Sequence, residues 1–592
     1  MRTRFKTLLL LPILFVSVGC SKSDKISFQC DDFTFDTYFN DSYFYLDNHE
    51  VHQEIALASH AMALATFNGN KDYSLRSNYL RDLWQKEKFE HIWMSDSFYK
   101  KPETDSIGFG IASKKIEDFT LIAIAVRGGN YDAEWTSNLT LGPSGNAQGF
   151  DEASDHVIEG LTTFVTNYEI SGRIKIWISG YSRAAITSNM TAGKILYRMS
   201  QSDLINKNVN YTSDDIYAYC FEPPMGVMLP LETVRGDLYH GIHNFLNYND
   251  FVPLVAPYEW GFTRYGTDHY YPDRLNDIYF DESEREKIIT LYHFTYGAEK
   301  FAHYSVDEWK FFDVGEARAT PNNLPRESVN PSQGRFSRSL IRELALTGIE
   351  SRESYNAFVE LGMREVMTAV MVANDKIEKI DLKNLVKIIF EYDFIKSLIM
   401  ELEEDQTSQF AMDVQMLILQ IFGANEDNFD EVQKLYTDNF MFFSMFAKAF
   451  AIRKDIMTQL LYRDNAMGIA IGHMPEVSYS FLSACDTRFL GKDACKLNDG
   501  SYYILHVDKP TSFTLIEKNI KKSVFSYKNG VMESKHLSAE KYADGSIDIY
   551  LPKNGEYEYL CDSLGLSLAY QDPLQDKVIS NATLPMEGTL KF

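Results

Sequence analysis

The stretch Arg173–Ala185, RIKIWISGYSRAA, decides how this chain can fold. Its first half alternates isoleucine with other residues, and this period of two predicts a β-strand. The strand pattern ends at Ser179-Gly180, and helical spacing follows over Arg183–Met199. A serine, Ser182, therefore stands at the turn between a predicted strand and a predicted helix.

The five residues Gly180–Ala184 match the pattern of a nucleophile elbow, G-x-S-x-G, in which a serine sits on a tight strand-to-helix turn. Such a turn needs small residues on both sides of the serine. Gly180 meets this need, and Ala184 replaces the second glycine with the smallest possible side chain. An alternative is that Ser182 is only a helix N-cap, because serine is a preferred capping residue. The pentapeptide alone leaves both interpretations open.

The chain has 592 residues, which favours about four domain-sized units. Hydrophobic residues make up 45% and aromatic residues 14%, a composition that indicates large packed cores and not a disordered chain. The net charge of −25 argues against nucleic-acid binding, because phosphate contacts need clustered lysine and arginine. After the N-terminal segment no run reaches about 18 apolar residues, so no transmembrane helix is predicted.

Residues 1–20 have the pattern of a bacterial export signal. Basic residues precede an apolar run, Leu8–Val18, which is shorter than a membrane-spanning helix requires. The run ends in Ser17-Val18-Gly19-Cys20, which resembles a lipoprotein lipobox with Ser17 where leucine is commoner. We therefore expect lipid on Cys20, which would anchor the protein to a membrane of the cell envelope. An ordinary secretory signal peptide, which would give a secreted protein, is the alternative.

The cysteines and histidines point to neither a disulfide framework nor a metal site. Six cysteines in a chain of this length are too few for a framework, although Cys485 and Cys495 could close a short loop. Cys220 lies in a predicted strand and is expected to be a buried free thiol. The thirteen histidines are scattered without zinc-binding spacing, so no metal is predicted.

Strand-like and helix-like runs alternate in the first half of the chain. Residues 25–105 form a polar, aromatic-rich lead-in with a helical pattern around Val51–Phe67. Leu121–Val126 is a continuous apolar run, typical of a strand that is buried on both faces. Ile216–Phe221 and Ile242–Tyr248 predict two more strands. This alternation predicts an α/β fold with a mainly parallel sheet.

The second half changes character twice. Residues 283–461 are dominated by helical periodicity with many methionines and phenylalanines, which suits either a lid over an apolar pocket or a helical subdomain with its own core. Residues 497–592 contain short β-like runs and predict a small antiparallel β-domain. Four dipeptides there favour hairpin turns: Asp499-Gly500, Asn529-Gly530, Asp544-Gly545 and Asn554-Gly555. The two that begin with asparagine are the clearest.

A serine hydroxyl needs a base before it can act as a nucleophile. In α/β-hydrolases the acid and the histidine follow the serine along the chain. Asp250 comes directly after a predicted strand, where it could orient a histidine or simply stabilise a turn. His473 lies on a predicted loop before a helix, where it could be a general base or only a capping or surface histidine. His293 and His303 are rival bases in helical patterns.

An oxyanion hole requires backbone N–H groups that point at the developing negative charge. The N–H of Arg183 follows the serine directly. Arg127-Gly128-Gly129 follows the predicted strand Leu121–Val126, and its glycines allow close approach of a substrate to the backbone. Gly129 is therefore the second candidate donor, and a plain glycine turn is the alternative.

These motifs together resemble the class 3 lipase family, a branch of the α/β-hydrolases that includes the fungal-type lipases. The matching segments occur in order and are Ala125–Gly142, Ile178–Ala185, Cys220–Gly226, Asn247–Val255 and Gly472–Leu482. They fall within 105–282 and 462–490, about a third of the chain. The resemblance implies Ser182 as nucleophile, Asp250 as orienting acid and His473 as base, with Arg183 and Gly129 in the oxyanion hole. Gly129 stands where the family usually has threonine or serine, so it can offer only its N–H.

The patterns along the chain, taken with this resemblance for the core, predict an organisation in which the C-terminal β-domain lies outside the resemblance. We expect a lipoprotein-type signal peptide at 1–20, an α/β-hydrolase core at 21–282 and 462–496, a long helical insertion at 283–461 and a β-rich C-terminal domain at 497–592. Trp135, Ser137 and Asn138 match a structural segment of the family. The insertion departs from compact family members and leaves the choice of substrate open.

The expected activity is hydrolysis of carboxylic esters, with acylglycerol or phospholipid esters first, through an acyl-enzyme on Ser182. No metal or organic cofactor is implied. The expected partners are an ester or lipid substrate and, through Cys20, a membrane surface. Two alternatives stay open: a non-catalytic envelope protein that uses the scaffold to bind a partner, and an acyltransferase or amidase with the same triad.

Overall fold

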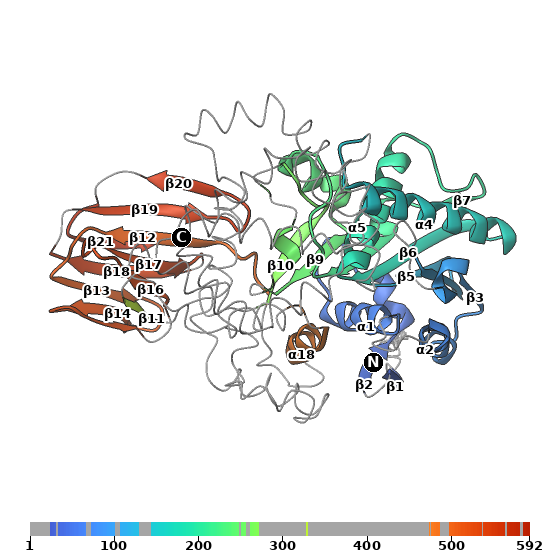
Figure 1. Cartoon of the computed structure of the whole chain (residues 1–592), viewed down its shortest axis with the longest axis horizontal. Coiled ribbons are helices and arrows are strands. Elements are labelled where there is room, and N and C mark those ends of the chain that lie inside the picture. Colours follow the sequence, from blue (N-terminus) through green and yellow to red (C-terminus); the bar gives the residue numbers. More distant parts are fainter. Residues whose placement is uncertain are drawn as a thin grey trace, which may run out of the picture.

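The computed structural model describes residues 24–30, 33–66, 73–100, 107–128, 144–247, 250, 252–255, 258, 261–271, 327–329, 473, 475–485, 497–534, 537–553, 555–562, 565–580 and 584–592. These residues form an α/β core and a β-domain beside it (Figure 1). Cys20, the segment with Gly129, the rival histidines His293 and His303, Cys495 and nearly all of the predicted helical insertion lie outside them.

The core is built on an eight-stranded sheet whose main path has the order β10-β9-β8-β6-β5-β4-β3. Neighbours from β5 to β10 are parallel, and β4 and β3 add antiparallel strands at one side. The bounds are β3 His91–Met94, β4 Phe109–Ile116, β5 Phe119–Val126, β6 Gly172–Tyr181, β7 Val209–Asn210, β8 Ile216–Phe221, β9 Ile242–Leu246 and β10 Thr267–Tyr270. The predicted parallel strands are confirmed, and the sheet fits an α/β-hydrolase-like core.

Alternate residues of the central strands pack into separate cores on the two faces of the sheet. In β5, Ile122 and Ile124 pack on one face while Ala123 and Ala125 pack on the other, and all four are buried. In the parallel pairing of β5 with β6, Ile124 lies opposite Ile178. This burial on both faces explains why the strand reads as an uninterrupted apolar run.

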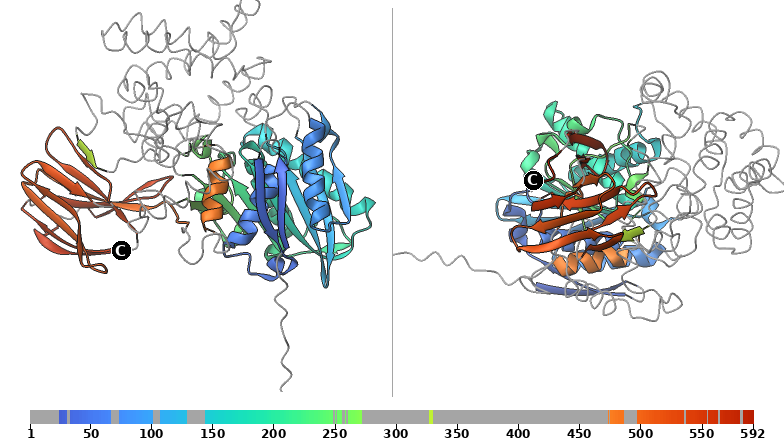
Figure 2. Two further views of the ribbon diagram at one scale, coloured as in Figure 1. Left: turned by 90° about the horizontal axis from the view of Figure 1, so that it is seen from below. Right: turned by 90° about the vertical axis from the view of Figure 1, so that its left-hand side faces the viewer.

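Helices cover both faces of the sheet (Figure 2). The core with Ile122 contains residues of α4, Gln148–Asn167, and α5, Arg183–Ser200. The opposite core contains residues of α1, Gln53–Leu64, α2, Tyr73–Lys86, and α18, Pro475–Cys485. No helix in this described part of the chain is long and apolar enough to cross a membrane.

The lead-in contains more strand than its sequence predicts. The helical pattern around Val51–Phe67 is confirmed as α1, but β1, Asp24–Cys30, and β2, Phe33–Phe39, form an antiparallel hairpin ahead of it. Cys220 is buried and free, as expected. The remaining short helical segments are η1 Asp41–Tyr45, η2 Asp96–Tyr99, η3 Ser213–Asp215, α6 Leu231–Val234, η4 Asp237–Tyr239 and η5 Val252–Leu254.

The predicted antiparallel β-domain is present and has two sheets with one shared core. Their strand orders are β11-β16-β17-β12-β19-β20 and β15-β14-β13-β18-β21. The bounds are β11 Glu327–Val329, β12 Tyr502–Val507, β13 Ser512–Glu517, β14 Lys522–Lys528, β15 Val531–Ser534, β16 Ala539–Lys541, β17 Ile547–Pro552, β18 Glu556–Cys561, β19 Leu566–Gln571, β20 Asp576–Ser580 and β21 Glu587–Lys591.

Two of the predicted turns have different outcomes. Asn529 and Gly530 have φ values of 53° and 91°, which fit a two-residue hairpin, and they join the paired strands β14 and β15. The hairpin expected at Asn554-Gly555 is wrong, because β17 and β18 on either side belong to different sheets. There the chain crosses from one sheet to the other instead of turning back on its neighbour.

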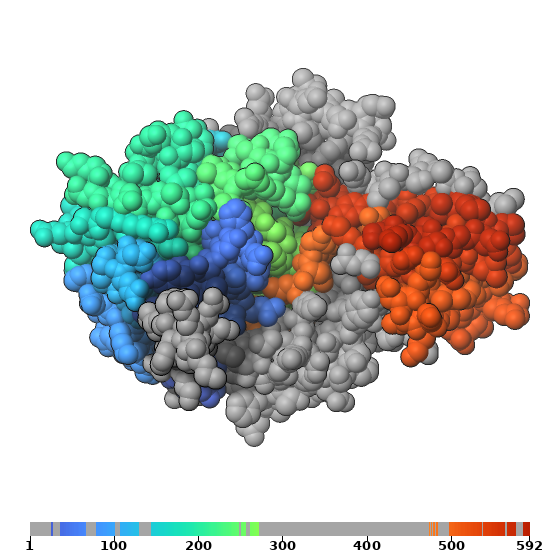
Figure 3. Space-filling view, turned by 180° about the vertical axis from the view of Figure 1, so that it is seen from behind, coloured from blue at the N-terminus to red at the C-terminus, as the bar shows by residue number. Residues whose placement is uncertain are grey.

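The described part of the 283–461 segment is a strand. Residues Glu327–Val329 form β11, which pairs antiparallel with β16 and so extends a sheet of the C-terminal domain. The C-terminal domain also contacts the core at β10, where Tyr270 and Asn498 exchange backbone hydrogen bonds of 2.7 and 3.0 Å. Tyr270 packs there with Tyr502 and Tyr550 in a small shared cluster. The space-filling view shows the two parts in contact at this junction (Figure 3).

Candidate active site

The serine of the predicted elbow lies between the end of β6 at Tyr181 and the start of α5 at Arg183. Ser182 has φ 58° and ψ −126°, a backbone conformation that non-glycine residues rarely adopt and that stores about 1–3 kcal/mol of strain. Its N–H donates to the carbonyl of Phe221 in β8 over 2.9 Å. The neighbouring strand thus holds the strained turn in place.

Close packing explains the small residues that flank the serine. A Cβ atom added to Gly180 would lie 2.3 Å from the carbonyl oxygen of Ala184 and 2.8 Å from Oγ of Ser188. Because one obstacle is backbone, it cannot move aside as a flexible side chain would. Ala184 itself is fully buried, so the turn accommodates a methyl group at the second motif position. Glycine is therefore required at 180 but not at 184.

The structure brings the predicted serine, histidine and aspartate together. Nε2 of His473 lies 2.8 Å from Oγ of Ser182, and Nδ1 of His473 lies 2.6 Å from Oδ2 of Asp250. The Ser182 side chain makes no capping hydrogen bond to α5. Of the two interpretations of the pentapeptide, the geometry is therefore that of an elbow and not of a side-chain N-cap.

Asp250 serves the turn and the histidine with different oxygen atoms. Its Oδ1 accepts a hydrogen bond from the N–H of Val252 over 2.9 Å, and its own N–H donates to Asn247 over 3.0 Å. Its Oδ2 faces His473. Since the side chain is fully buried, the turn fixes the carboxylate in a single orientation toward the imidazole. The turn role considered from sequence thus supports the orienting role.

The residue beside the serine also contacts the histidine. The Tyr181 hydroxyl donates to the backbone carbonyl of His473 over 3.0 Å, and the two rings lie 5.6 Å apart between centroids. His473 stands just before α18, on the loop position that its sequence predicts. Tyr181 therefore links the elbow to the segment that carries the base.

This arrangement can carry out acyl transfer. With a carboxylate facing Nδ1, the imidazole holds its proton there, and Nε2 is left to accept the proton of Ser182. Asp250 would then stabilise the imidazolium that forms. A chain of serine, histidine and aspartate with these contacts is the arrangement that activates a serine nucleophile.

One candidate oxyanion donor is well placed in the described chain. Arg183 is the first residue of α5, so its N–H is among those that the helix cannot satisfy internally. Gly129 lies outside the described residues, but the residue that begins its loop is firmly held. The Arg127 guanidinium donates to the carbonyls of Ser97 and Phe98 over 3.0 and 2.8 Å. The start of the candidate oxyanion loop is thus tied to η2.

Sequence reasoning missed a second buried carboxyl group, Glu222, which directly follows β8. It is fully buried, with φ 52°. Its Oε2 accepts from the N–H of Asn247 over 2.8 Å and its Oε1 from the hydroxyl of Ser478 over 2.9 Å, and it is hydrogen-bonded to Asp250. Burial raises the pKa of the Glu222 carboxyl well above its usual value, and the charge of Asp250 raises it further. The feature of the sequence that could have indicated Glu222 is a glutamate between apolar residues at the end of a predicted strand.

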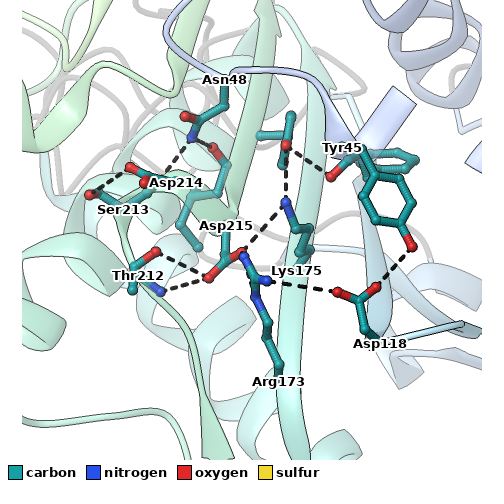
Figure 4. Close-up of polar contacts among 12 residues, drawn as sticks. Tyr45, Asn48, Asp118, Arg173, Lys175, Thr212, Ser213, Asp214 and Asp215 are labelled. Atoms are coloured by element: carbon teal, nitrogen blue, oxygen red, sulfur yellow. Dashed lines mark hydrogen bonds and ion pairs between the residues drawn. The ribbon is translucent and has the colours of Figure 1, made fainter. Parts of the chain in front are cut away.

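A separate group of paired charges lies at the amino ends of the parallel strands (Figure 4). Asp215, before β8, accepts from Arg173 over 2.8 Å and lies 3.6 Å from the ammonium of Lys175, so buried charges there are paired. Nearby, His49, Asp214 and His240 have ligand atoms within 4.8 Å of one another and could hold a metal ion, a group that the sequence did not predict. Both clusters lie at the amino ends of the parallel strands, away from Ser182.

Comparisons with known proteins add the following. No family model matches the chain, and no curated protein matches it. Solved structures of lipases are similar. The native Rhizomucor miehei lipase propeptide complex is 17% identical over 38% of this chain and 70% of that chain, with a TM-score of 0.26. The mono- and diacylglycerol lipase from Aspergillus oryzae is 16% identical over 38% of this chain and 82% of that chain, also with a TM-score of 0.26. The lipase from Rhizopus microsporus var. chinensis is 13% identical over 37% of this chain and 75% of that chain, with a TM-score of 0.24. At TM-scores this low, the similarity does not indicate the activity of this chain.

Proposed function

We propose that this chain is a serine hydrolase that cleaves carboxylic esters, with lipid esters as its main substrates. One observation supports the proposal above all: the continuous contacts from Ser182 Oγ through His473 to Asp250, of 2.8 and 2.6 Å, on a strained strand-to-helix turn. Strain of this kind persists only where the surrounding structure maintains it, and such positions cluster at active sites.

In the proposed reaction Ser182 Oγ attacks the ester carbonyl carbon while Nε2 of His473 takes the hydroxyl proton. The N–H groups of Arg183 and Gly129 would stabilise the oxyanion of the tetrahedral intermediate. The intermediate collapses, the alcohol leaves with the proton from His473, and the acyl group stays on Ser182. Water, deprotonated by His473, then attacks the acyl-enzyme and releases the carboxylic acid.

The choice of lipid esters has two supports, the class 3 lipase resemblance and the methionine- and phenylalanine-rich composition of 283–461. We also propose that lipid on Cys20 holds the enzyme at a membrane of the cell envelope, where such substrates are concentrated. An acyltransferase or amidase would share the acyl-enzyme and differ only in the acceptor or leaving group.

A fluorophosphonate probe tests the activated serine without knowledge of the substrate. The protein without residues 1–20 is treated with the probe, and intact mass is measured for the parent, Ser182→Ala and His473→Ala. We expect one adduct on the parent, none on Ser182→Ala and greatly slowed labelling of His473→Ala. Hydrolysis of esters of graded chain length, alone and with detergent, then defines the substrate. A folded parent that stays unlabelled with and without detergent would favour the non-catalytic binding protein.

A further inference from the structure

Two carboxyl groups meet behind the candidate base, and only one of them belongs to the triad. Asp250 contacts His473 directly, and Glu222 contacts Asp250 from the end of the neighbouring strand, β8. Both side chains are buried. Two carboxylates so close together repel each other strongly, so such a pair normally shares one proton.

We propose that Glu222 carries this proton and donates it in a hydrogen bond to Asp250, which makes Glu222 a positioning residue for the triad. The inference rests on the function proposed above and deepens it. Asp250 then accepts hydrogen bonds from both neighbours, the imidazole on one side and the Glu222 carboxyl on the other. Ionisation of Glu222 at alkaline pH would set two negative charges against each other and release His473 from its fixed orientation.

The surroundings of Glu222 support this assignment. The charged or titratable groups that act on Glu222 electrostatically are Asp250, Tyr181 and Arg264, and its neutral hydrogen-bond donors are the Asn247 N–H and the Ser478 hydroxyl. Arg264 is the one cation among these, and its guanidinium is already held by Asp268 through contacts of 2.8 and 2.9 Å. Asp268 therefore compensates most of the positive charge of Arg264, which leaves little of it to stabilise an ionised Glu222.

The neutral donors hold Glu222 without supplying charge. The hydroxyl of Ser478 comes from α18, the helix that follows His473, and the N–H of Asn247 comes from the turn that carries Asp250. Glu222 thus binds both segments that bring the triad partners to Ser182. Its backbone is also fixed, since its N–H donates to Phe245 in β9 over 2.8 Å.

Glu222→Gln tests the proton assignment, because an amide can donate to Asp250 as a protonated carboxyl does but cannot ionise. The readout is the rate of Ser182 labelling by the fluorophosphonate from neutral to alkaline pH. We expect the parent to label more slowly as Glu222 ionises at alkaline pH, and Glu222→Gln to stay within about threefold of the parent at neutral pH and to lack the alkaline decline. Glu222→Leu, which cannot donate, should label roughly 10- to 100-fold more slowly at all pH values.

Three further measurements keep the test independent of folding defects. The infrared spectrum of the parent at neutral pH should contain the carbonyl stretch of a protonated carboxyl group that Glu222→Gln lacks. Glu517→Gln changes another fully buried carboxyl, in the C-terminal domain, and should alter neither the labelling rate nor its pH dependence. Ser478→Ala removes a donor that favours the ionised carboxylate, so the alkaline decline should move to higher pH.

The outcomes separate this inference from the proposed function. If the parent itself never labels, the proposed function fails. If the parent labels but Glu222→Gln keeps the alkaline decline, or if the infrared band is unchanged in Glu222→Gln, the assignment of the proton to Glu222 is wrong. A labelling rate for Glu222→Gln as low as that of Glu222→Leu would likewise overturn it.

Discussion

The hydroxyl of Tyr181 donates a hydrogen bond to the backbone carbonyl of His473 over 3.0 Å, although the two residues are 292 positions apart. Tyr181 occupies the variable position directly before Ser182 in the elbow motif. The strand that presents the candidate nucleophile therefore also fixes the segment that presents the candidate base. The separation of the reacting atoms, 2.8 Å, depends on this link as well as on the side chains themselves.

We expect Tyr181→Phe to weaken activation of Ser182 while the protein stays folded. The variant loses the hydrogen bond to the His473 carbonyl and a 3.3 Å contact with Ser478 Oγ. A loss of about 1 kcal/mol at the His473 segment should slow fluorophosphonate labelling by about fivefold. Tyr502→Phe is a matched control, because it removes a buried tyrosine hydroxyl from the small cluster beside β10. Equal labelling rates for Tyr181→Phe and the parent would show that the link does not position the base.

The strain at Ser182 predicts opposite effects on activity and stability. Glycine adopts φ 58° and ψ −126° readily, whereas alanine keeps the steric conflict of serine. Ser182→Gly and Ser182→Ala should both be inactive. Ser182→Gly should nevertheless be more stable than Ser182→Ala by about 1 kcal/mol, after the greater freedom of glycine in the unfolded chain is subtracted. Urea unfolding of the two variants side by side measures the difference. A less stable Ser182→Gly would mean that the backbone at this turn is not strained.

The two flanking positions of the motif should differ in their tolerance of change. Gly180→Ala places a methyl group 2.3 Å from the Ala184 carbonyl oxygen, so the turn must distort and labelling of Ser182 should fall by at least about tenfold. Ala184→Gly restores the commoner motif and should keep the labelling rate. It should lower stability by about 1 kcal/mol, because glycine is a poorer helix former than alanine. Similar labelling rates for the two variants would contradict this asymmetry.

The parts of the fold that were predictable have strong local patterns. Leu121–Val126 in β5 is an unbroken apolar run because both faces are buried, and the β6-turn-α5 unit carries a motif with its own steric requirements. The strands β3 and β4 were missed because their place in the sheet comes from antiparallel pairing with β5 and not from a distinctive sequence. The turn dipeptide Asn554-Gly555 misled because a dipeptide does not specify which strands pair.

The candidate site divides in the same way. Ser182, Asp250 and His473 could be selected because each has a chemical type and a chain position that the elbow context demands. Tyr181 and Glu222 could not, since their importance depends on partners from distant segments. From sequence alone, a tyrosine before the serine or a glutamate after a strand could equally be a surface residue without a role in the site. Only the packing of α18 and the β9 turn against the sheet gives them a role.

A buried histidine under the elbow predicts how the core responds to acid. His60 in α1 is fully buried, its ring lies 5.7 Å from that of Tyr181, and burial lowers the pKa of its imidazole to about 3. The unfolded chain binds a proton at His60 below its ordinary pKa of about 6.5, while the folded protein does not until about pH 3. This difference lowers the stability as pH falls through that window, by about 1.4 kcal/mol per pH unit for one histidine.

His60→Leu should therefore flatten the acid side of the stability profile. Between about pH 6 and pH 4 its unfolding free energy, followed by tryptophan fluorescence in urea, should fall less steeply than that of the parent. His506→Gln should behave oppositely, because its hydrogen bond to Asp548 raises the pKa of His506. That contact stabilises the fold below the unfolded pKa and is lost as pH rises through the folded pKa, so His506→Gln should lose stability at acid pH and little at alkaline pH. Parallel profiles for His60→Leu and the parent would show that His60 is protonated in the folded core.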